Sequence, residues 1–292
     1  MAQHQELNEK PGLWKEKENE TDSNSILAAF RKGSFSGHFR YFFMATQNED
    51  GLTDYHAHAA GGGIKFESGR FRNFQVGVSG FFVFNIGSSD LSKADNRTGQ
   101  MNRYEIGLFD IEDPTNKKDI DRLEELYLKY HFHHNQIILG KQLLNTPFIN
   151  LQDGRMRPSE VEGLWAEIRS LKKLKIQGGY LYGMSPRSTV KWYRADESIG
   201  IYPVGVNENG SKSGYAGQLQ SKGILLAGVT WEISKSWKLQ AWNQWVQNIF
   251  NTALLQPEYE YSFPDKSKLF ASAQLIFQQA IRQGGNPDPL KS

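Results

Sequence analysis

The chain has 292 residues, of which 38% are hydrophobic and 13% aromatic, and it contains 28 glycines and no cysteine. Its 34 basic and 32 acidic residues leave a net charge of only +2, which gives no electrostatic footprint for nucleic acid. The lack of cysteine excludes a disulfide framework and a Cys-ligated zinc site. No apolar run reaches the ~20 residues of a membrane-spanning helix, and the N-terminus has no signal-peptide core. The protein is therefore expected to be cytoplasmic or to have had a leader removed.

The first 33 residues are polar and charged and end in a short helix-like stretch that starts at Ser25. We predict that residues 1–33 form a tether and that residues 34–292 form one strand-rich domain. From residue 34 onward, apolar residues recur with the period of two that is typical of strands. This pattern predicts ten strands, at residues 34–44, 55–68, 73–84, 125–134, 135–144, 162–170, 173–183, 222–233, 237–246 and 268–278.

Each predicted strand has one apolar and one polar side. In SFSGHFRYFFM, Phe35, Phe39 and Phe43 share one side, whereas His38 and Arg40 share the other. The hydrophobic content is low for a chain with a large dry core, so the aromatic residues need another apolar environment. Strands of a transmembrane barrel fit this pattern, because one side contacts lipid and the other contacts a polar lumen.

The predicted connections alternate between extended and tight along the chain. Extended ones include 87–121, 185–220 and a stretch from about Asn248 to Asp265, whereas turns such as HFHHNQ and SLKK are tight. Transmembrane barrels sort their connections in this way, with short turns on the periplasmic side and longer loops outside. The expected fold class is thus an all-β, antiparallel up-and-down transmembrane barrel. Soluble sandwiches, propellers and barrels are the alternative, because their strands also alternate apolar and polar residues.

The segment from Gly140 to Trp165 contains GKQ, then NTPFINLQDGRMRP, then EGLW. This string resembles the OprD-like family of substrate-specific outer-membrane porins, particularly its Bacteroidota-type members. GHFRYFFMAT and GVSGFFVFNIGSSDL are similar to that family's first and third strands. The resemblance implies a barrel of about 18 strands in the cell outer membrane. It also implies passive uptake of small, often carboxylate-bearing solutes, a basic lumen wall, and neither enzyme activity nor a cofactor.

The same resemblance sets the expected partners and the ends of the chain. The partners would be small solutes and outer-membrane lipid or lipopolysaccharide, while the oligomeric state, a trimer for example, stays open. The polar tether would lie in the periplasm, and a signal peptide would already have been removed. Ten predicted strands and a final GGNPDPLKS without an aromatic-ended last strand indicate a C-terminally truncated chain.

The stretch between Pro147 and Pro158 is the candidate constriction. Proline cannot donate to a strand ladder, so this stretch is predicted to be a loop. Its apolar residues would pack it back into the barrel: Phe148, Ile149 and Leu151. It would then expose three charged side chains to the channel: Asp153, Arg155 and Arg157. Fixed charges of both signs would select solutes by charge, and arginine can bind a carboxylate bidentately.

A purely structural interpretation of this loop remains open. Asp153 would then form an Asx turn with Gly154, and the arginines would pair with Glu160 or Glu162 to hold the loop shut.

Strand parity gives candidates for the basic lumen wall. Six basic residues fall on the polar sides of their strands: Arg40, Lys65, Lys129, Arg169, Lys175 and Lys238. A charge on the lipid side at mid-membrane would cost roughly 2–4 kcal/mol, which favours the lumen for them. Glu167 and Glu232 share the inferred lumen side, so a structural ion-pair network is the open alternative to a transport path.

Histidine gives the strongest signal for a metal or enzyme site, and it is weak. YHAH and HFHH each place two imidazoles on one strand face, a spacing used by zinc and copper sites. The two groups belong to opposite strand ends, roughly 25 Å or more apart at 3.3 Å per residue. Interfacial or turn residues are therefore favoured over a metal site, and no catalytic motif occurs. The alternative to a porin is a soluble or surface β-rich binding module without channel activity.

Overall fold

The computed structural model describes residues 22–102, 104–116, 118, 120–149, 151, 155–169, 171–202, 209–282 and 284–286. Its helices are α1 (Ile26–Arg31), the 3-10 helix η1 (Glu105–Leu108) and α2 (Ala195–Ser198). Its first strands are β1 (Ser34–Thr46), β2 (Tyr55–Glu67), β3 (Phe74–Ser88), β4 (Arg122–Phe132), β5 (Asn135–Gln142), β6 (Glu160–Ile168) and β7 (Leu174–Ser185). The others are β8 (Tyr193–Arg194), β9 (Ile224–Glu232), β10 (Trp237–Val246), β11 (Phe250–Ser262), β12 (Lys268–Ser272) and β13 (Leu275–Ala280).

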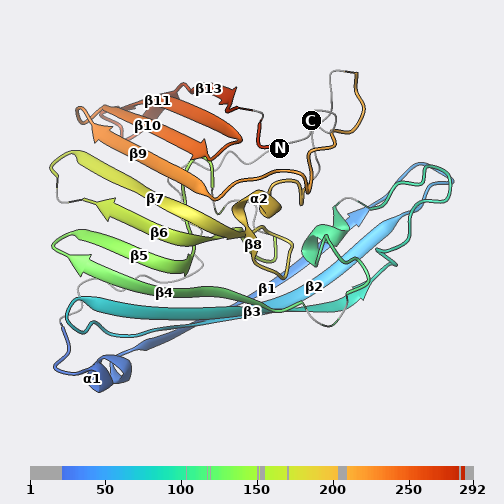
Figure 1. Cartoon of the computed structure of the whole chain (residues 1–292), viewed down its shortest axis with the longest axis horizontal. Coiled ribbons are helices and arrows are strands. Elements are labelled where there is room, and N and C mark those ends of the chain that lie inside the picture. Colours follow the sequence, from blue (N-terminus) through green and yellow to red (C-terminus); the bar gives the residue numbers. More distant parts are fainter. Residues whose placement is uncertain are drawn as a thin grey trace. The chain divides into compact units, whose positions relative to one another are not determined.

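The strands form one sheet, in which neighbours along the chain pair, and Figure 1 labels most of them. The order is β1-β2-β3-β4-β5-β6-β7-β9-β10-β11-β12, with β8 beside β7 and β13 beside β11. The expected all-β antiparallel fold is confirmed. No helix among the described residues is both long and apolar enough to cross a membrane.

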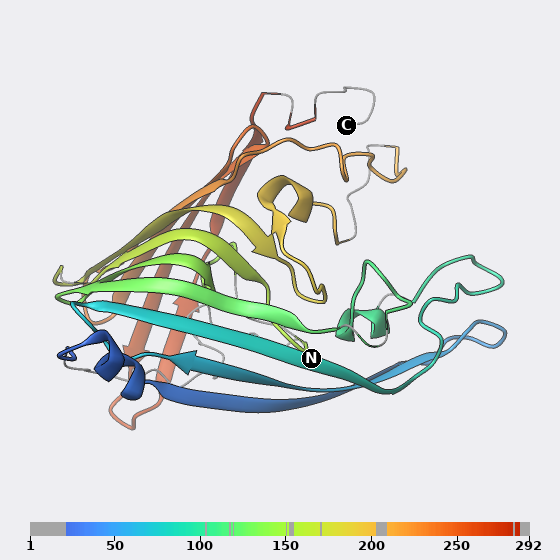
Figure 2. The ribbon, with the colours of Figure 1, turned by 60° about the horizontal axis from the view of Figure 1, so that its bottom comes forward.

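The chain divides into two compact units, which are treated separately below. Unit 1 comprises Met1–Leu128, Gly140–Val161 and Met184–Trp192. Unit 2 comprises Lys129–Leu139, Glu162–Gly183 and Tyr193–Ser292. In unit 1, Figure 2 shows β1, β2 and β3 side by side, with α1 at one end of these strands and η1 toward the other.

The apolar side of the strands is the exposed side, as the alternation predicted. In β1, Phe35 and Phe39 are 77% and 76% exposed, while the alternate residues Ser36 and His38 are less exposed. β3 repeats the pattern, because Phe82 and Phe84 are exposed and Phe81 is buried. This arrangement is the reverse of a water-soluble sheet and is typical of a strand with lipid on its outer side.

The opposite side of β2 and β3 is covered by loops that lie within unit 1. Its buried apolar cluster joins both strands to the segment between β3 and β4 and to the loop between β5 and β6. The cluster consists of Tyr55, Ala57, Ala59, Phe81, Val83, Leu91, Ile106, Leu108, Phe109, Ile120 and Met156. The polar side of these strands therefore carries packed loops.

The short helix predicted near Ser25 is confirmed. The Ser25 hydroxyl accepts a hydrogen bond from the Ala28 amide at 3.1 Å, which caps the first turn of α1. The tight turn predicted in HFHHNQ is also confirmed, since β4 ends at Phe132 and β5 begins at Asn135.

The C-terminal part of the predicted strand pattern was wrong. The stretch from Asn248 to Asp265 was predicted as an extended connection, but it contains β11, which pairs with β10 over its first ten residues, Phe250 to Tyr259. The single strand predicted at 268–278 is two strands, both paired with β11. The interruption falls opposite Pro257, which has no amide proton to donate and only accepts from the Ala273 amide, at 3.2 Å.

One long connection and one strand start also differ from the prediction. The connection predicted at 185–220 contains the short strand β8 and helix α2. β4 begins at Arg122, three residues before the predicted start at Glu125.

Candidate functional site

The loop between β5 and β6, residues 143–159, lies against the covered side of β2 and β3 in unit 1. Met156 is only 2% exposed and belongs to the buried cluster with Phe81 and Leu108. At the start of the loop, the Thr146 amide donates to the Ile149 carbonyl at 2.7 Å, and the Ile149 amide donates to the Thr146 hydroxyl at 2.9 Å. These bonds and the buried methionine fix the described parts of the loop, on either side of residues 150–154.

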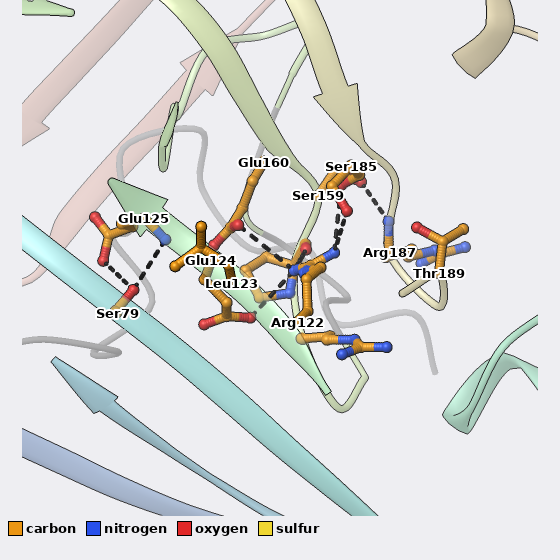
Figure 3. A network of polar contacts seen from close by, with 12 residues as sticks. Ser79, Arg122, Leu123, Glu124, Glu125, Ser159, Glu160, Ser185, Arg187 and Thr189 are labelled. Atoms are coloured by element: carbon orange, nitrogen blue, oxygen red, sulfur yellow. Dashed lines mark hydrogen bonds and ion pairs between the residues drawn. The ribbon is translucent and has the colours of Figure 1, made fainter. Parts of the chain in front are cut away.

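Arg122, at the start of β4, ties this loop to the last residue of β7, Ser185. One terminal nitrogen of its guanidinium donates to the Pro158 carbonyl at 2.7 Å and to Glu124 at 3.1 Å. The other donates to the Ser185 hydroxyl at 3.0 Å. Figure 3 shows the Arg122 side chain between Glu124, Glu160 and Ser185. Because its side chain is fully buried, Arg122 acts as a fixed cross-link between neighbouring segments.

Glu160 adds a buried carboxylate to this cluster. Its side chain is fully buried, and neither carboxylate oxygen has a hydrogen-bond partner among the described residues. Its ion pair is with Arg122, at 3.8 Å, so the partner is neither Arg155 nor Arg157. Because this ion pair is buried, removal of the Arg122 guanidinium would destabilise the region around Glu160.

Arg157 is also buried, with 2% of its surface exposed. One of its terminal nitrogens donates to the Ile120 carbonyl at 3.0 Å, and the other is buried and has no hydrogen-bond partner in the part of the chain that the structure describes. Arg157 lies in the loop, outside the strands, and burial together with the charge of Arg122 lowers its pKa to about 9. The guanidinium therefore remains cationic at neutral pH.

Arg155 and Arg40 are the more accessible cations of the site. Arg155 donates to the Tyr104 carbonyl at 3.1 Å, and Arg40 of β1 donates to the carbonyl of Arg155. Both side chains belong to partly exposed residues. Among the described residues, neither guanidinium makes an ion pair with a carboxylate. The third predicted loop charge, Asp153, lies outside the described residues.

The other predicted wall residues have partners nearby. Lys65 pairs with Glu125 at 3.0 Å, and Glu125 also accepts from Ser79. In unit 2, Arg169 pairs with Glu167 at 2.6 Å, and Lys238 pairs with Glu258. Polar or electrostatic contacts also engage the remaining two, Lys129 and Lys175.

The histidines of YHAH lie on the outer side of the sheet. The Tyr41 hydroxyl and His58 Nδ1 are 2.8 Å apart, and the rings of Phe43 and His58 are 4.4 Å apart. Across the part of the chain that the structure describes, no group of three or more His, Asp or Glu side chains could hold a metal ion. His58 thus packs among the aromatic side chains of β1, and the His56 ring lies 6.1 Å from it.

The sequence did not single out Arg122. It lies in DIDRLEE, a run of alternating charges that is typical of a solvated loop, and the predicted strand began only at Glu125. Extending the period of two backward from Tyr127 and Glu125 would have placed Arg122 one residue out of phase. The position of Arg122 follows from the tertiary structure alone.

The profile described as outer membrane porin, OprD family, matches residues 29–284. The chain therefore belongs to the OprD family and is an outer-membrane protein with the fold of the barrel porins. Proteins of this family are porins rather than enzymes. Among curated protein sequences, none matches the chain.

Solved porin structures share the fold. OccAB1 of Acinetobacter baumannii is 14% identical, with a TM-score of 0.64 over 90% of this chain and 56% of that one. OpdK of Pseudomonas aeruginosa, solved with vanillate, is 17% identical, with a TM-score of 0.61 over 87% of this chain and 59% of that one. A BenF-like porin of Pseudomonas fluorescens Pf-5 is 13% identical, with a TM-score of 0.64 over 87% of this chain and 59% of that one. The chain thus spans less than two thirds of these structures.

Proposed function

We propose that the protein forms a passive channel for small carboxylate-bearing solutes across the outer membrane. The loop 143–159 would form the constriction, and Arg40 and Arg155 would attract the anion. Membership of the OprD family supports a channel. A similar porin, OpdK, was solved with vanillate, a carboxylate, which supports the solute class.

The observation that carries the proposal is the bonding of Arg40 and Arg155. Each donates to a backbone carbonyl, which fixes the guanidinium, and neither forms an ion pair with a carboxylate of the described residues. An arginine held in this way can offer its remaining donors to a planar carboxylate in a bidentate pair. By contrast, Lys65 and Lys238 have carboxylate partners and contribute less to the field in the channel.

Arg157 and Asp153 would have different roles in this channel. Arg157 is buried, so it would add positive potential and hold the loop through the Ile120 carbonyl rather than contact solute. Asp153 would supply the opposite charge of the constriction. Lys65, Lys129, Arg169, Lys175 and Lys238 would form the basic part of the lumen wall, largely within ion-pair networks.

The experiment is a measurement of ion selectivity in planar bilayers containing the reconstituted protein. We expect anion preference in the reversal potential under a salt gradient, and a smaller preference in Arg155→Ala and in Arg40→Gln. Arg97→Ala is a matched control, because Arg97 also donates to a backbone carbonyl, that of Asp50 at 3.3 Å. Arg97 lies in the loop after β3, and Asp50 lies in the loop after β1.

Two results would overturn the proposal. One is the absence of channel conductance from folded protein. The other is an unchanged selectivity in both Arg155→Ala and Arg40→Gln, which would leave these residues with a structural role only. The alternative of a soluble β-rich binding module is not favoured, because the exposed side of the strands is apolar.

A further inference from the structure

Helix α1 presents an apolar surface that no described residue covers. Ile26 and Leu27 are 60% and 61% exposed, and Phe30 is 48% exposed. These residues stand at positions i, i+1 and i+4, so their side chains lie on one side of the helix. The opposite side is occupied, since Ala29 is buried and its carbonyl accepts from the Gly69 amide at 2.8 Å. The exposed side of α1 is therefore fixed in direction.

The segment before α1 is bound to the turn between β2 and β3. The Ser23 amide donates to the Arg70 carbonyl at 2.8 Å, and the Asn73 amide donates to the Asp22 carboxylate at 3.1 Å. Figure 2 shows α1 at this end of β1, β2 and β3. The helix is thus held at both of its ends. Before it, Ser23 is bonded to the turn between β2 and β3, and after it the chain continues into β1.

The apolar surface of α1 continues into the lipid-facing side of the strands. Phe30 stacks on Phe66 of β2, with ring centroids 5.9 Å apart, and Phe66 in turn contacts Phe35 of β1 at 4.9 Å. Phe35 is among the most exposed aromatic residues of the outer side. Gly33 permits this approach, because a Cβ there would lie 2.4 Å from the Phe66 ring.

Basic residues surround this surface. Arg31 and Lys32 end the helix, and Arg70 and Arg72 lie in the adjoining turn, where Arg72 sits 5.4 Å from the centroid of the Phe71 ring. This end of the sheet carries the tight turns, which face the periplasm in outer-membrane barrels. Long basic side chains at such a boundary reach phosphate groups while their stems cover apolar surface.

We propose that α1 is an in-plane membrane anchor that lies in the periplasmic leaflet of the outer membrane. Ile26, Leu27 and Phe30 enter the boundary between headgroups and acyl chains, next to Phe35 and Phe66. Arg31, Lys32, Arg70 and Arg72 bind the phosphates of anionic phospholipids. Residues 22–32 are then part of the membrane-bound structure and not part of a solvated tether. This inference depends on the outer-membrane fold and not on the solute that the channel carries.

The absence of cysteine makes the test direct, since one introduced cysteine can be labelled selectively. Leu27→Cys would be labelled with an environment-sensitive NBD dye and reconstituted into vesicles of phosphatidylcholine and phosphatidylglycerol. We expect blue-shifted emission and strong quenching by lipids that carry a doxyl group near the headgroup. Glu49→Cys, in the exposed turn after β1, is the control and should show emission typical of water and little quenching. Heat-dependent gel mobility would confirm that both variants are folded.

A second measurement addresses the charges. In the labelled Leu27→Cys protein, raising the phosphatidylglycerol fraction should increase the quenching, and Arg31→Gln with Lys32→Gln should reduce this lipid dependence. Emission typical of water at Leu27→Cys in folded protein, or quenching no greater than at Glu49→Cys, would overturn the anchor. Quenching that ignores the lipid charge would overturn the role of the basic residues. Neither result depends on whether the protein conducts ions.

Discussion

The position of the Arg155 guanidinium is set by a glycine in another segment. A Cβ at Gly107, in η1, would lie 1.8 Å from a terminal nitrogen of Arg155. The same guanidinium donates to the Tyr104 carbonyl, at the start of η1. The Arg155 guanidinium can therefore lie against η1 only because residue 107 has no side chain.

Gly107→Ala should displace Arg155 without changing any charge. The guanidinium is the flexible end of a long side chain, so it can swing away at little cost to folding. If the position of Arg155 matters, anion preference should fall in Gly107→Ala about as far as in Arg155→Ala. Reversal potentials in planar bilayers would measure this, with Arg97→Ala as the control for an unrelated arginine. Wild-type selectivity in Gly107→Ala would show that the location of the charge within the loop is unimportant.

The sequence identified some of the site residues and not the residue that organises them. Arg155 and Arg157 stood out because two prolines and three apolar residues marked a packed loop. That Arg157 is buried and Arg155 is partly exposed could not be predicted, because burial here depends on η1 and Ile120 in a distant segment. Arg122 was missed because a charged run before a strand normally indicates solvent.

The strands were predictable where the two sides differ clearly in polarity. β1 and β3 alternate aromatic and small or polar residues, and both were found near their observed bounds. β11 was missed because its sequence NTALLQPEYEYS contains Pro257 and two glutamates, which argue against a strand. The structure accommodates both features, since Pro257 lies beside the break between β12 and β13, and Glu258 pairs with Lys238.

Glycines within the strands make room for aromatic rings on the neighbouring strand. In unit 1, a Cβ at Gly77 would lie 2.3 Å from the Tyr127 ring. In unit 2, Gly228 of β9 is the register partner of Trp242 of β10, and a Cβ there would lie 2.2 Å from the indole. Each ring lies over a glycine on the covered side of its strand, which is a packing arrangement that strand patterning alone does not reveal.

Gly228→Ala should destabilise the sheet. Trp242 is buried and its ring is rigid, so the added methyl group forces a shift that typically costs about 1–3 kcal/mol. Gly87→Ala, in β3, is the matched control, because no atom lies within 4 Å of its added Cβ. Urea unfolding of the reconstituted protein, followed by tryptophan fluorescence, would compare the two. Equal midpoints would contradict the packing role of Gly228.

At the scale of the whole molecule, the exposed apolar side of the sheet is the feature that links fold to location. Residues such as Phe35, Phe39 and Phe84 would be a liability in water, and in an outer-membrane protein they face lipid. The polar sides carry buried charges that are mostly paired, as Lys65 is with Glu125. The division of polarity between the two sides was visible in the sequence, whereas the ion pairs were not.

The strand order also determines the time course of assembly. Since the main strands pair with neighbours along the chain, the sheet can grow by adding one hairpin after another. The Arg122 contacts differ, because they reach Pro158 and Ser185, 36 and 63 residues away. Those contacts should form after the rate-limiting step of folding.

Arg122→Lys, which loses the guanidinium fork, should therefore unfold faster while refolding at the wild-type rate, as tryptophan fluorescence kinetics would measure. Slower refolding would instead mean that Arg122 belongs to the folding nucleus. The end of the loop 143–159 would then be in place before the neighbouring strands of the sheet have all paired.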